Sequence, residues 1–416
     1  MSHADAESPF RSRTVWLCAA LHAFTHIYWV ALTPLYLKIQ EGLGLASVSQ
    51  VTLLVTVMMI AYFVPSYPVG VLADRFSRKR LLAVGLLVNS LAFIGLGCSR
   101  TFGAALGCAV LAGLGGSFYH PAATALVARR HPVQTGRALG LVGIGASVGF
   151  FVGPVYAGWR AQVSGWQAPL IELGMAGVIM TGVFWYLARD SEPSVPAAAP
   201  VVAHSPPRRM AATWWFTLLT AALFLSLRDF SGSAVGSGGA LFLQQAHGFT
   251  LGRSGFALSM IFLGSAVGNP FFGQLADRRL APGLLLVLSA AAGMTALFGR
   301  LPGGWMIPAF LVYGFFFMGS YPMTEAAVVR AIPDAIRGRA VGVFMTVGGL
   351  VGNMAHWWVG GRIERLGDAA SDPAAYVPLF VILAAMILAS LGALPWLLKL
   401  GSLAAAARPS QPDPTP

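Results

Sequence analysis

The chain has 416 residues, of which 56% are hydrophobic and only 10% are charged, and its formal net charge is +12. Soluble domains are about a quarter charged, so this composition excludes an ordinary soluble protein. It indicates a chain that lies largely in lipid.

Twelve apolar stretches follow one another along the chain, each long enough to cross a bilayer as a helix. Backbone polar groups in lipid must bond within their own segment, which favours helices. We therefore predict an all-α membrane protein with twelve transmembrane helices. The expected spans are 15–37, 49–69, 81–98, 103–127, 138–158, 168–188, 213–243, 255–273, 281–299, 305–328, 339–361 and 376–398.

The basic residues predict the orientation. With the N-terminus inside, nineteen Lys and Arg fall on the inner side, seven fall on the outer side, and Arg228 lies within a span. Positive charge is retained in the cytoplasm, so we expect both termini to be cytoplasmic in a multi-pass protein of the cell inner membrane. The basic excess then reports topology, and we expect no nucleic-acid partner.

The first span carries two histidines, His22 and His26, four residues apart and so on one helix face with Trp29 and Thr33. Ionisable residues within spans are costly, so each is a candidate for substrate binding or proton coupling. The alternative is a hydrogen-bonded structural pair. The spacing also suits a metal, but no carboxylate or cysteine sits beside the pair, so we predict no metal site.

A charged loop, GVLADRFSRKR at 70–80, follows the second span, and a shorter copy, GQLADRR at 273–279, follows the eighth. Each half therefore repeats in the same direction. We predict two pseudo-symmetric six-helix halves. The expected domains are 1–188, a Pro- and Ala-rich cytoplasmic linker at 189–212, the second half at 213–400, and a disordered cytoplasmic tail at 401–416.

This repeated loop resembles the signature of the major facilitator superfamily, and the resemblance covers essentially the whole chain. Glycines would let helices approach closely, and each aspartate could accept from a helix N-terminus or pair with arginine across the halves. The resemblance implies a cytoplasmic gate, whereas simple positive-inside anchoring is the alternative. The predicted gating residues are Gly70, Asp74, Arg75, Arg78, Gly273, Asp277 and Arg278. Ser77 stands where the family usually has glycine, and the second copy lacks the trailing basic residues, which predicts a weaker C-terminal latch.

The fourth span contains GLGGSFYHPAATALVARRHP at 113–132, and the seventh contains LRDFSG at 227–232. Both resemble segments of the fosmidomycin-resistance-like branch of the superfamily, and they make Tyr119 and His120 candidates for the central cavity. That branch often has an acidic residue after His-Pro, where this chain has Ala122. A proton-carrying carboxylate is therefore missing at that place.

The fifth span resembles the antiporter motif of the superfamily through Gly140, Gly149, Gly153 and Pro154. Small residues on one stripe permit close helix packing, and proline kinks the helix. The resemblance implies export, and generic small-residue packing is the alternative.

Further ionisable groups lie in later spans. Arg228 and Asp229 are adjacent in the seventh span, so the arginine could bind substrate or pair across the interface while the aspartate titrates; a structural ion pair is the alternative. Glu325 in the tenth span is either a coupling group or an ion-pair partner near the membrane edge. Asn353 and His356 in the eleventh span are expected near the cavity.

The resemblance implies a secondary transporter, not an enzyme, that exports a small organic molecule in exchange for protons by alternating access. The chain has no P-loop, and we expect no cofactor. The expected partners are a small-molecule substrate, protons and the lipid bilayer, and we expect a monomer. Two alternatives remain open: proton-coupled uptake of an organic anion, and a transporter-like sensor or lipid-handling protein.

Overall fold

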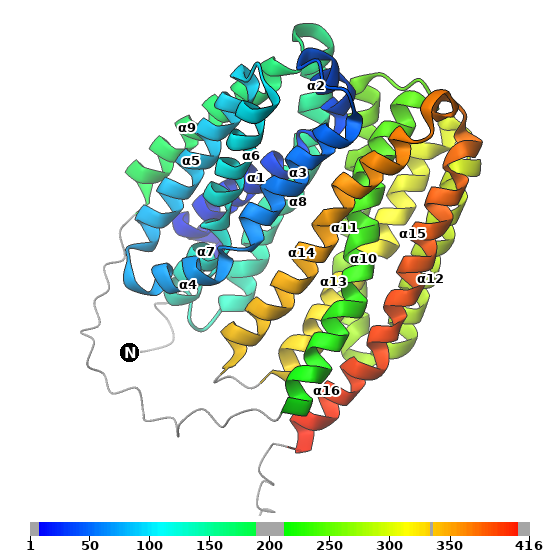
Figure 1. Cartoon of the computed structure of the whole chain (residues 1–416). Helices are drawn as coiled ribbons and strands as arrows, with labels where there is room; N and C mark the ends of the chain where they lie inside the picture. The colour runs from blue at the N-terminus through cyan, green and yellow to red at the C-terminus, as the bar shows by residue number, and fades with distance from the viewer. Residues whose placement is uncertain (1–7, 189–211, 333–335, 407–416) are drawn as a thin grey trace, which may run out of the picture.

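The computed structural model describes residues 8–188, 212–332 and 336–406 of the chain, and within these ranges the regular structure is helical. For residues 66–67, 74, 276–278, 337–339 and 404–406, the structure describes the backbone and not the side chain. Figure 1 shows two helical bundles side by side, with the blue to teal helices in one and the green to red helices in the other.

The first bundle holds six spans, and three of them are built from two helices each. Its helices are α1 (Arg13–Val30), α2 (Tyr36–Gly42), α3 (Val48–Phe63), α4 (Ser66–Arg75), α5 (Arg78–Cys98), α6 (Phe102–Ser117), α7 (Tyr119–Arg130), α8 (Thr135–Ser164) and α9 (Gln167–Leu187). Two short 3-10 helices, η1 (Pro9–Arg11) and η2 (Thr33–Leu35), precede α1 and α2.

The second bundle repeats this plan with longer helices. They are α10 (Ala212–Gln245), α11 (Leu251–Arg278), α12 (Leu280–Leu297), α13 (Met306–Ala331), α14 (Arg337–Glu364), α15 (Val377–Ala389) and α16 (Leu394–Ala406). Single 3-10 turns connect several of them, at Phe298–Arg300, Gly303–Trp305, Gly367–Ser371, Pro373–Tyr376 and Ser390–Ala393.

The described residues contain ten helical stretches that are long and apolar enough to cross a membrane. The shorter apolar helix α3, which continues as α4, and the 28-residue α14 bring the total to the twelve spans expected from the sequence. The expected linker lies outside the described residues up to position 211. Helix α16 continues through residues 401–406, which the sequence analysis assigned to the tail, and residues 407–416 lie outside the description.

Prolines explain why spans of the first bundle are broken. Pro34 lies in η2 between α1 and α2, and Pro65 is the N-cap of α4. In the fourth span, Pro121 lacks the N–H that would bond to the carbonyl of Ser117, the last residue of α6. The break that follows places the first turn of α7, with His120, at the middle of the span.

The two bundles meet first through α8 and α11. Gly255 of α11 lies directly against the backbone of Pro154 in α8, so a side chain there would collide with it. The hydroxyl of Ser259 donates a hydrogen bond of 2.8 Å to the carbonyl of Phe151. Both contacts use the half of α8 that lies toward its C-terminal end.

The second meeting of the bundles is between α3 and α14. The Thr56 hydroxyl donates to the carbonyl of Asn353 and accepts from the N–H of Trp357, both at 3.0 Å. Gly360 lies against Thr52 with no room for a side chain. Like the contacts between α8 and α11, these contacts lie in the parts of the helices farther from the basic loops.

Several glycines on the opposite side of the molecule face open space. A Cβ atom added at Gly70 of α4, Gly140 of α8 or Gly342 of α14 would have no neighbour within 4 Å. The helix ends that carry them lie on the side of α4, α7 and α16, at the lower edge of Figure 1, where the basic residues gather. The contacts described above between α8 and α11 and between α3 and α14 thus lie away from the basic loops, although Gly349 of α14 also lies against Phe63 at the end of α3.

Candidate substrate and ion-coupling site

Three histidines converge in the first bundle, and we call them the histidine cluster: His22 and His26 of α1 and His120 of α7. One ring nitrogen of each lies within 4.8 Å of the others. The ring centroids of His22 and His120 are 5.1 Å apart, and those of His26 and His120 are 6.0 Å apart. The histidines of the first and fourth spans, which the sequence analysis named separately, thus lie in contact.

The tight packing of α8 against α1 positions this cluster. Gly145 and Gly149 lie against the backbone of α1 at Ala19 and Ala23, and a Cβ at Gly153 would meet the carbonyl of Ile27 at 3.1 Å. Because these glycines leave no side chain between the helices, the backbone of α8 comes within reach of the α1 side chains.

The hydrogen bonds of the pair fix its tautomers. Nδ1 of His22 lies 3.0 Å from the carbonyl of Val142 in α8, and a carbonyl can only accept, so this nitrogen carries the hydrogen. Nε2 of His22 is then an acceptor, and Nε2 of His26 donates to it across 3.0 Å. Nδ1 of His26 is left as a buried acceptor with no hydrogen-bond partner among the described residues.

Aromatic rings surround the histidine cluster. Tyr119 stacks on His22 with ring centroids 4.7 Å apart, and Phe150 stacks on His26 at 4.1 Å. Trp29 meets His26 edge-on at 4.5 Å. Phe150 also stacks on Phe262 of α11 at 4.4 Å, so the aromatic wall continues into the second bundle.

Sequence reasoning missed Phe150 and Phe262, because a phenylalanine within a span carries no signal of which face it occupies. His120 is solvent-accessible although it lies mid-span, and its ring contacts lie on α1 and α3, so it faces the space between the halves.

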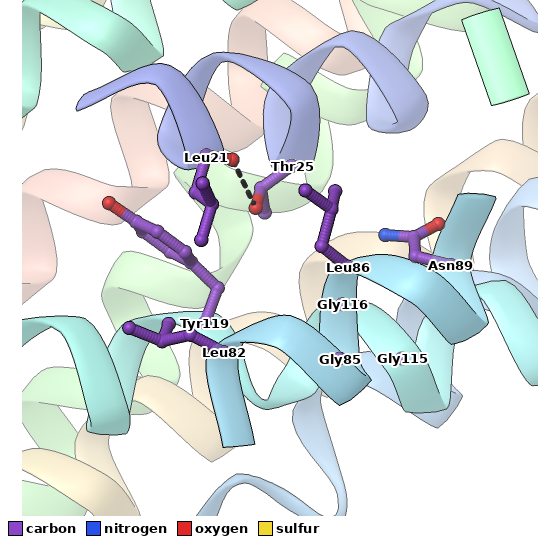
Figure 2. A pocket seen from close by; sticks show the side chains of 9 residues that line it. All are labelled: Leu21, Thr25, Leu82, Gly85, Leu86, Asn89, Gly115, Gly116 and Tyr119. Carbon is purple, nitrogen blue, oxygen red and sulfur yellow. Dashed lines mark hydrogen bonds between the residues drawn. The ribbon is translucent and has the colours of Figure 1, made fainter. Parts of the chain in front are cut away.

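A small cavity lies behind Tyr119 within the first bundle (Figure 2), with about 230 Å³ of empty space, including the part open to solvent. Thr25 lines it and donates to the carbonyl of Leu21 at 3.1 Å. Asn89 of α5 lines it from the opposite side, and its Oδ1 is buried without a hydrogen-bond partner among the described residues. The ring of Tyr119 thus separates this cavity from the histidine cluster.

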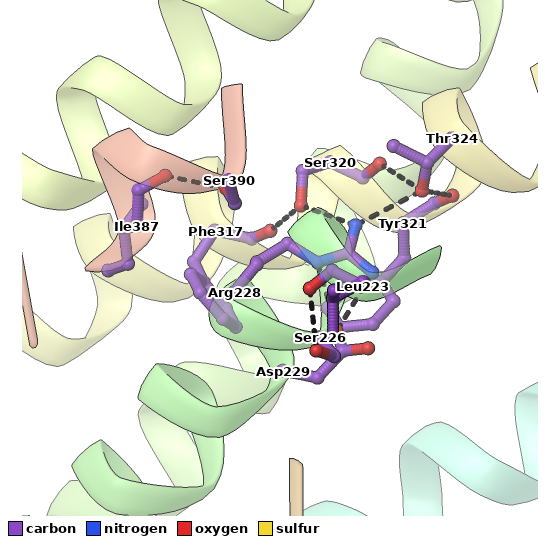
Figure 3. Close-up of polar contacts among 10 residues, drawn as sticks. All are labelled: Leu223, Ser226, Arg228, Asp229, Phe317, Ser320, Tyr321, Thr324, Ile387 and Ser390. Carbon is purple, nitrogen blue, oxygen red and sulfur yellow. Dashed lines mark hydrogen bonds and ion pairs between the residues drawn. The ribbon is translucent and has the colours of Figure 1, made fainter. Parts of the chain in front are cut away.

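The second bundle holds an ion pair on α10. Nε and NH2 of Arg228 donate to Oδ1 of Asp229 at 3.0 and 2.9 Å, and NH1 donates to the hydroxyls of Ser320 and Thr324 on α13 at 3.2 and 3.0 Å (Figure 3). The guanidinium also lies 3.8 Å from the ring centroid of Tyr321. All these partners belong to the second bundle, so none of them is a contact across the interface.

The two charges differ in exposure. The side chain of Arg228 is 3% exposed, whereas that of Asp229 is 22% exposed. Asp229 lies near Tyr321 and faces α14 at Gly348 and Gly352, where an added Cβ would lie 2.8 and 2.9 Å from its side chain. The carboxylate is therefore the accessible member of the pair. Glu325 is exposed and close enough to interact electrostatically with both charges.

His356 and Asn353 form part of a hydrogen-bonded chain between the halves. Asn353 Nδ2 donates to a backbone carbonyl of α14 at 2.7 Å, so its Oδ1 accepts from His356 Nε2 at 3.2 Å. His356 Nδ1 then accepts from the Ser237 hydroxyl at 2.6 Å, which accepts from the Tyr36 hydroxyl of the first bundle at 2.8 Å. The donor of each hydrogen bond in the series from Tyr36 to Asn353 is thereby assigned.

A further cavity lies between the two bundles and encloses about 400 Å³ of empty space, including the part open to solvent. Val30, Thr33 and Pro154 line it from the first bundle, and Phe262 and Tyr313 line it from the second. It is largely apolar and lies next to the contact between α8 and α11.

The structure places the expected packing and gating residues as follows. Gly149, Gly153 and Pro154 lie at helix contacts, whereas Gly140 does not. The nearest neighbour of a Cβ at Gly273 would be Pro322, at 3.7 Å. Arg75 is exposed and Arg78 is partly buried. The side chains of Asp74, Asp277 and Arg278 lie outside the described ones, so the gating pairs stay a prediction.

Two helical bundles that are sealed on one side around buried charges have the architecture of a multi-pass membrane transporter. A model of the Major Facilitator Superfamily matches residues 15–356. The chain belongs to this family of transporters.

Known relatives match parts of the chain. It is 32% identical over 155 residues to "Uncharacterized MFS-type transporter Rv1250" of Mycobacterium tuberculosis, which is 36% of this chain and 26% of that protein. It is 31% identical over 93 residues to "Multidrug resistance protein MdtH" of Shigella dysenteriae, 22% of this chain and 23% of that protein. It is 27% identical over 151 residues to "Quinolone resistance protein NorA" of Staphylococcus aureus, 36% of this chain and 38% of that protein. The matches thus span well under half of each relative.

Solved structures share the whole fold. A bacterial homologue of the human lysosomal transporter Spinster superposes with a TM-score of 0.70 at 18% identity, covering 97% of this chain and 98% of the other. A POT family transporter in complex with 5-aminolevulinic acid gives 0.71 at 13% identity, covering 93% and 96%. At these identities the likeness shows the fold. The finer resemblance to the fosmidomycin-resistance-like branch stays a prediction.

Proposed function

We propose that this transporter exports a small organic molecule from the cytoplasm in exchange for protons, by alternating access. The observation that supports proton coupling is the Arg228–Asp229 pair. Its carboxylate lies within the membrane span of α10 and is partly exposed toward α14. We further propose that the protein works as a monomer in the bacterial inner membrane.

Asp229 is suited to bind and release the coupling proton. When it is ionised, it neutralises Arg228 and accepts two hydrogen bonds from its guanidinium. When it is protonated, the guanidinium loses this counter-ion and keeps the two hydroxyls of α13, the face of Tyr321 and the more distant charge of Glu325. Protonation of Asp229 therefore changes the electrostatic attraction among the groups of α10 and α13. These groups lie next to the glycine face of α14, which must move as the halves rock.

The direction of transport is inferred from the binding surface. The aromatic wall of the histidine cluster favours planar organic molecules, and the exposed carboxylate of Glu325, near the Arg228–Asp229 pair, favours cations over anions. Arg228, the basic residue within a span, is already bonded to a carboxylate and two hydroxyls, which disfavours uptake of an organic anion. Relatives whose names denote multidrug and quinolone resistance agree with export.

Inside-out proteoliposomes with an acidic lumen test this proposal. Ethidium, a planar aromatic cation, should accumulate in the lumen while the lumen becomes more alkaline, and a protonophore should abolish both. Accumulation of organic anions with the opposite gradient would instead indicate uptake. Absence of flux and counterflow for a broad panel of solutes would favour the sensor or lipid-handling alternative.

A further inference from the structure

The histidine cluster has the donor spacing of a metal site. A metal ion bound to imidazoles at about 2.0–2.1 Å holds their nitrogens about 3–3.4 Å apart. The two Nε2 atoms of His22 and His26 are already 3.0 Å apart, and the third nitrogen lies within 4.8 Å. His120 is the exposed member of the three, so its ring can close the remaining distance by rotation about its own side chain.

The surroundings of His22 match those of a metal ligand. Ligating histidines almost always donate their other ring N–H to a carbonyl or carboxylate, which fixes the tautomer and the orientation of the ring. His22 already donates from Nδ1 to the carbonyl of Val142, so its Nε2 carries a lone pair, which faces Nε2 of His26. A metal ion would replace the hydrogen between the two Nε2 atoms, and that hydrogen would move to Nδ1 of His26, which is free of partners among the described residues.

We propose that His22, His26 and His120 form a binding site for a first-row transition-metal dication, such as Zn²⁺ or Co²⁺. Neutral imidazoles suit these ions, whereas Mg²⁺ and Ca²⁺ prefer oxygen ligands. Three protein ligands leave at least one coordination position open toward the central space, which water or an electron-donating atom of a bound molecule can fill.

All three ligands belong to the first bundle, so the ion does not tie the halves together. The sequence-based prediction of no metal rested on the lack of a third ligand beside the pair, and the structure places His120 there. The inference does not rest on the proposed function, because metal binding is measured without substrate or gradient.

Cobalt titration of the full-length protein in detergent, without a polyhistidine tag, tests the site. One equivalent of Co²⁺ should give the visible d–d absorption of a nitrogen-ligated ion, and Zn²⁺ should displace it. His120→Gln should weaken binding by about 100-fold or more, since even groups that only orient a ligand contribute about 10–100-fold. His120 is exposed, so this variant should fold, and a thermal melt checks it.

The matched controls are His247→Gln and His356→Gln, which remove histidines away from the cluster and should leave cobalt binding unchanged. His26→Gln is a second cluster variant and should behave like His120→Gln. The proposal is overturned if the unaltered protein gives no cobalt spectrum at millimolar metal, or if His120→Gln keeps the affinity while a control variant loses it.

Discussion

Asp229 illustrates how one carboxylate can serve both folding and proton transfer. Its Oδ1 accepts two hydrogen bonds from Arg228, and its exposed side faces α14. A neutral amide at this position keeps an acceptor for the guanidinium but cannot release a proton.

We therefore expect Asp229→Asn to fold and to bind substrate, while its transport loses dependence on pH. Substrate counterflow, which needs no net proton movement, should persist. Flux measured over a range of pH, with counterflow in the same vesicles, checks this. Glu325→Gln is the matched control on α13 and should keep the pH dependence. Normal pH-dependent flux in Asp229→Asn would transfer the coupling role to another residue.

Arg228→Ala should behave differently, because it leaves the partly buried Asp229 carboxylate within the span without its counter-ion. Removing one partner of a buried ion pair costs about 3–5 kcal/mol. We expect a strongly lowered melting temperature in detergent, and the double variant Arg228→Ala/Asp229→Asn should recover part of the loss. A single variant as stable as the unaltered protein would show that the pair contributes little to folding.

At the scale of elements, α8 is held to α1 and α11 by residues without side chains. Gly153 would place a Cβ 2.8 Å from Val30, whereas Gly140 on the same helix would meet nothing within 4 Å. Gly153→Leu should therefore overpack the interface at a cost of about 1–3 kcal/mol and uncouple exchange. Gly140→Leu is the matched control and should change neither the melting temperature nor the stoichiometry of protons and substrate. If exchange stays tightly coupled in Gly153→Leu, the close packing of the glycine stripe in α8 no longer supports export.

The twelve spans could be predicted from the sequence because apolar length alone determines what crosses a bilayer. The breaks within spans could not be predicted as reliably: Pro121 interrupts the fourth span, whereas Pro154 and Pro270 lie inside continuous helices. The outcome depends on which neighbouring groups satisfy the freed carbonyl.

The candidate site could be predicted in part. Histidines and charges within spans stand out against an apolar background, so His22, His120 and Asp229 were identified. The partners of these groups could not be identified in the same way. Ser320 and Thr324 are ordinary helix residues until tertiary packing brings α13 beside α10. The orientation of Phe150 likewise depends on how the two bundles meet.

At the scale of the whole molecule, α3 and α14 join the two halves on the side away from the basic loops. A Cβ atom at Gly361 of α14 would lie 4.0 Å from the Cβ of Ser49 in α3, within the range of about 3.5–4.5 Å that disulfides use. In a background without the three native cysteines, Ser49→Cys/Gly361→Cys should cross-link on oxidation and stop turnover. Reduction should restore transport, and each single-cysteine variant should be unaffected by oxidant. Full turnover in the cross-linked protein would mean that the outer contact does not open during transport.

The chain from Tyr36 through Ser237 and His356 to Asn353 also bears on leakage of the proton gradient. It begins in the first bundle at a phenol and ends on an amide whose hydrogen is bonded to a backbone carbonyl. Neither an amide nor a peptide carbonyl passes on a proton at neutral pH, so the chain is a dead end for proton hopping. We therefore expect this connection between the halves to hold them together without relaying protons.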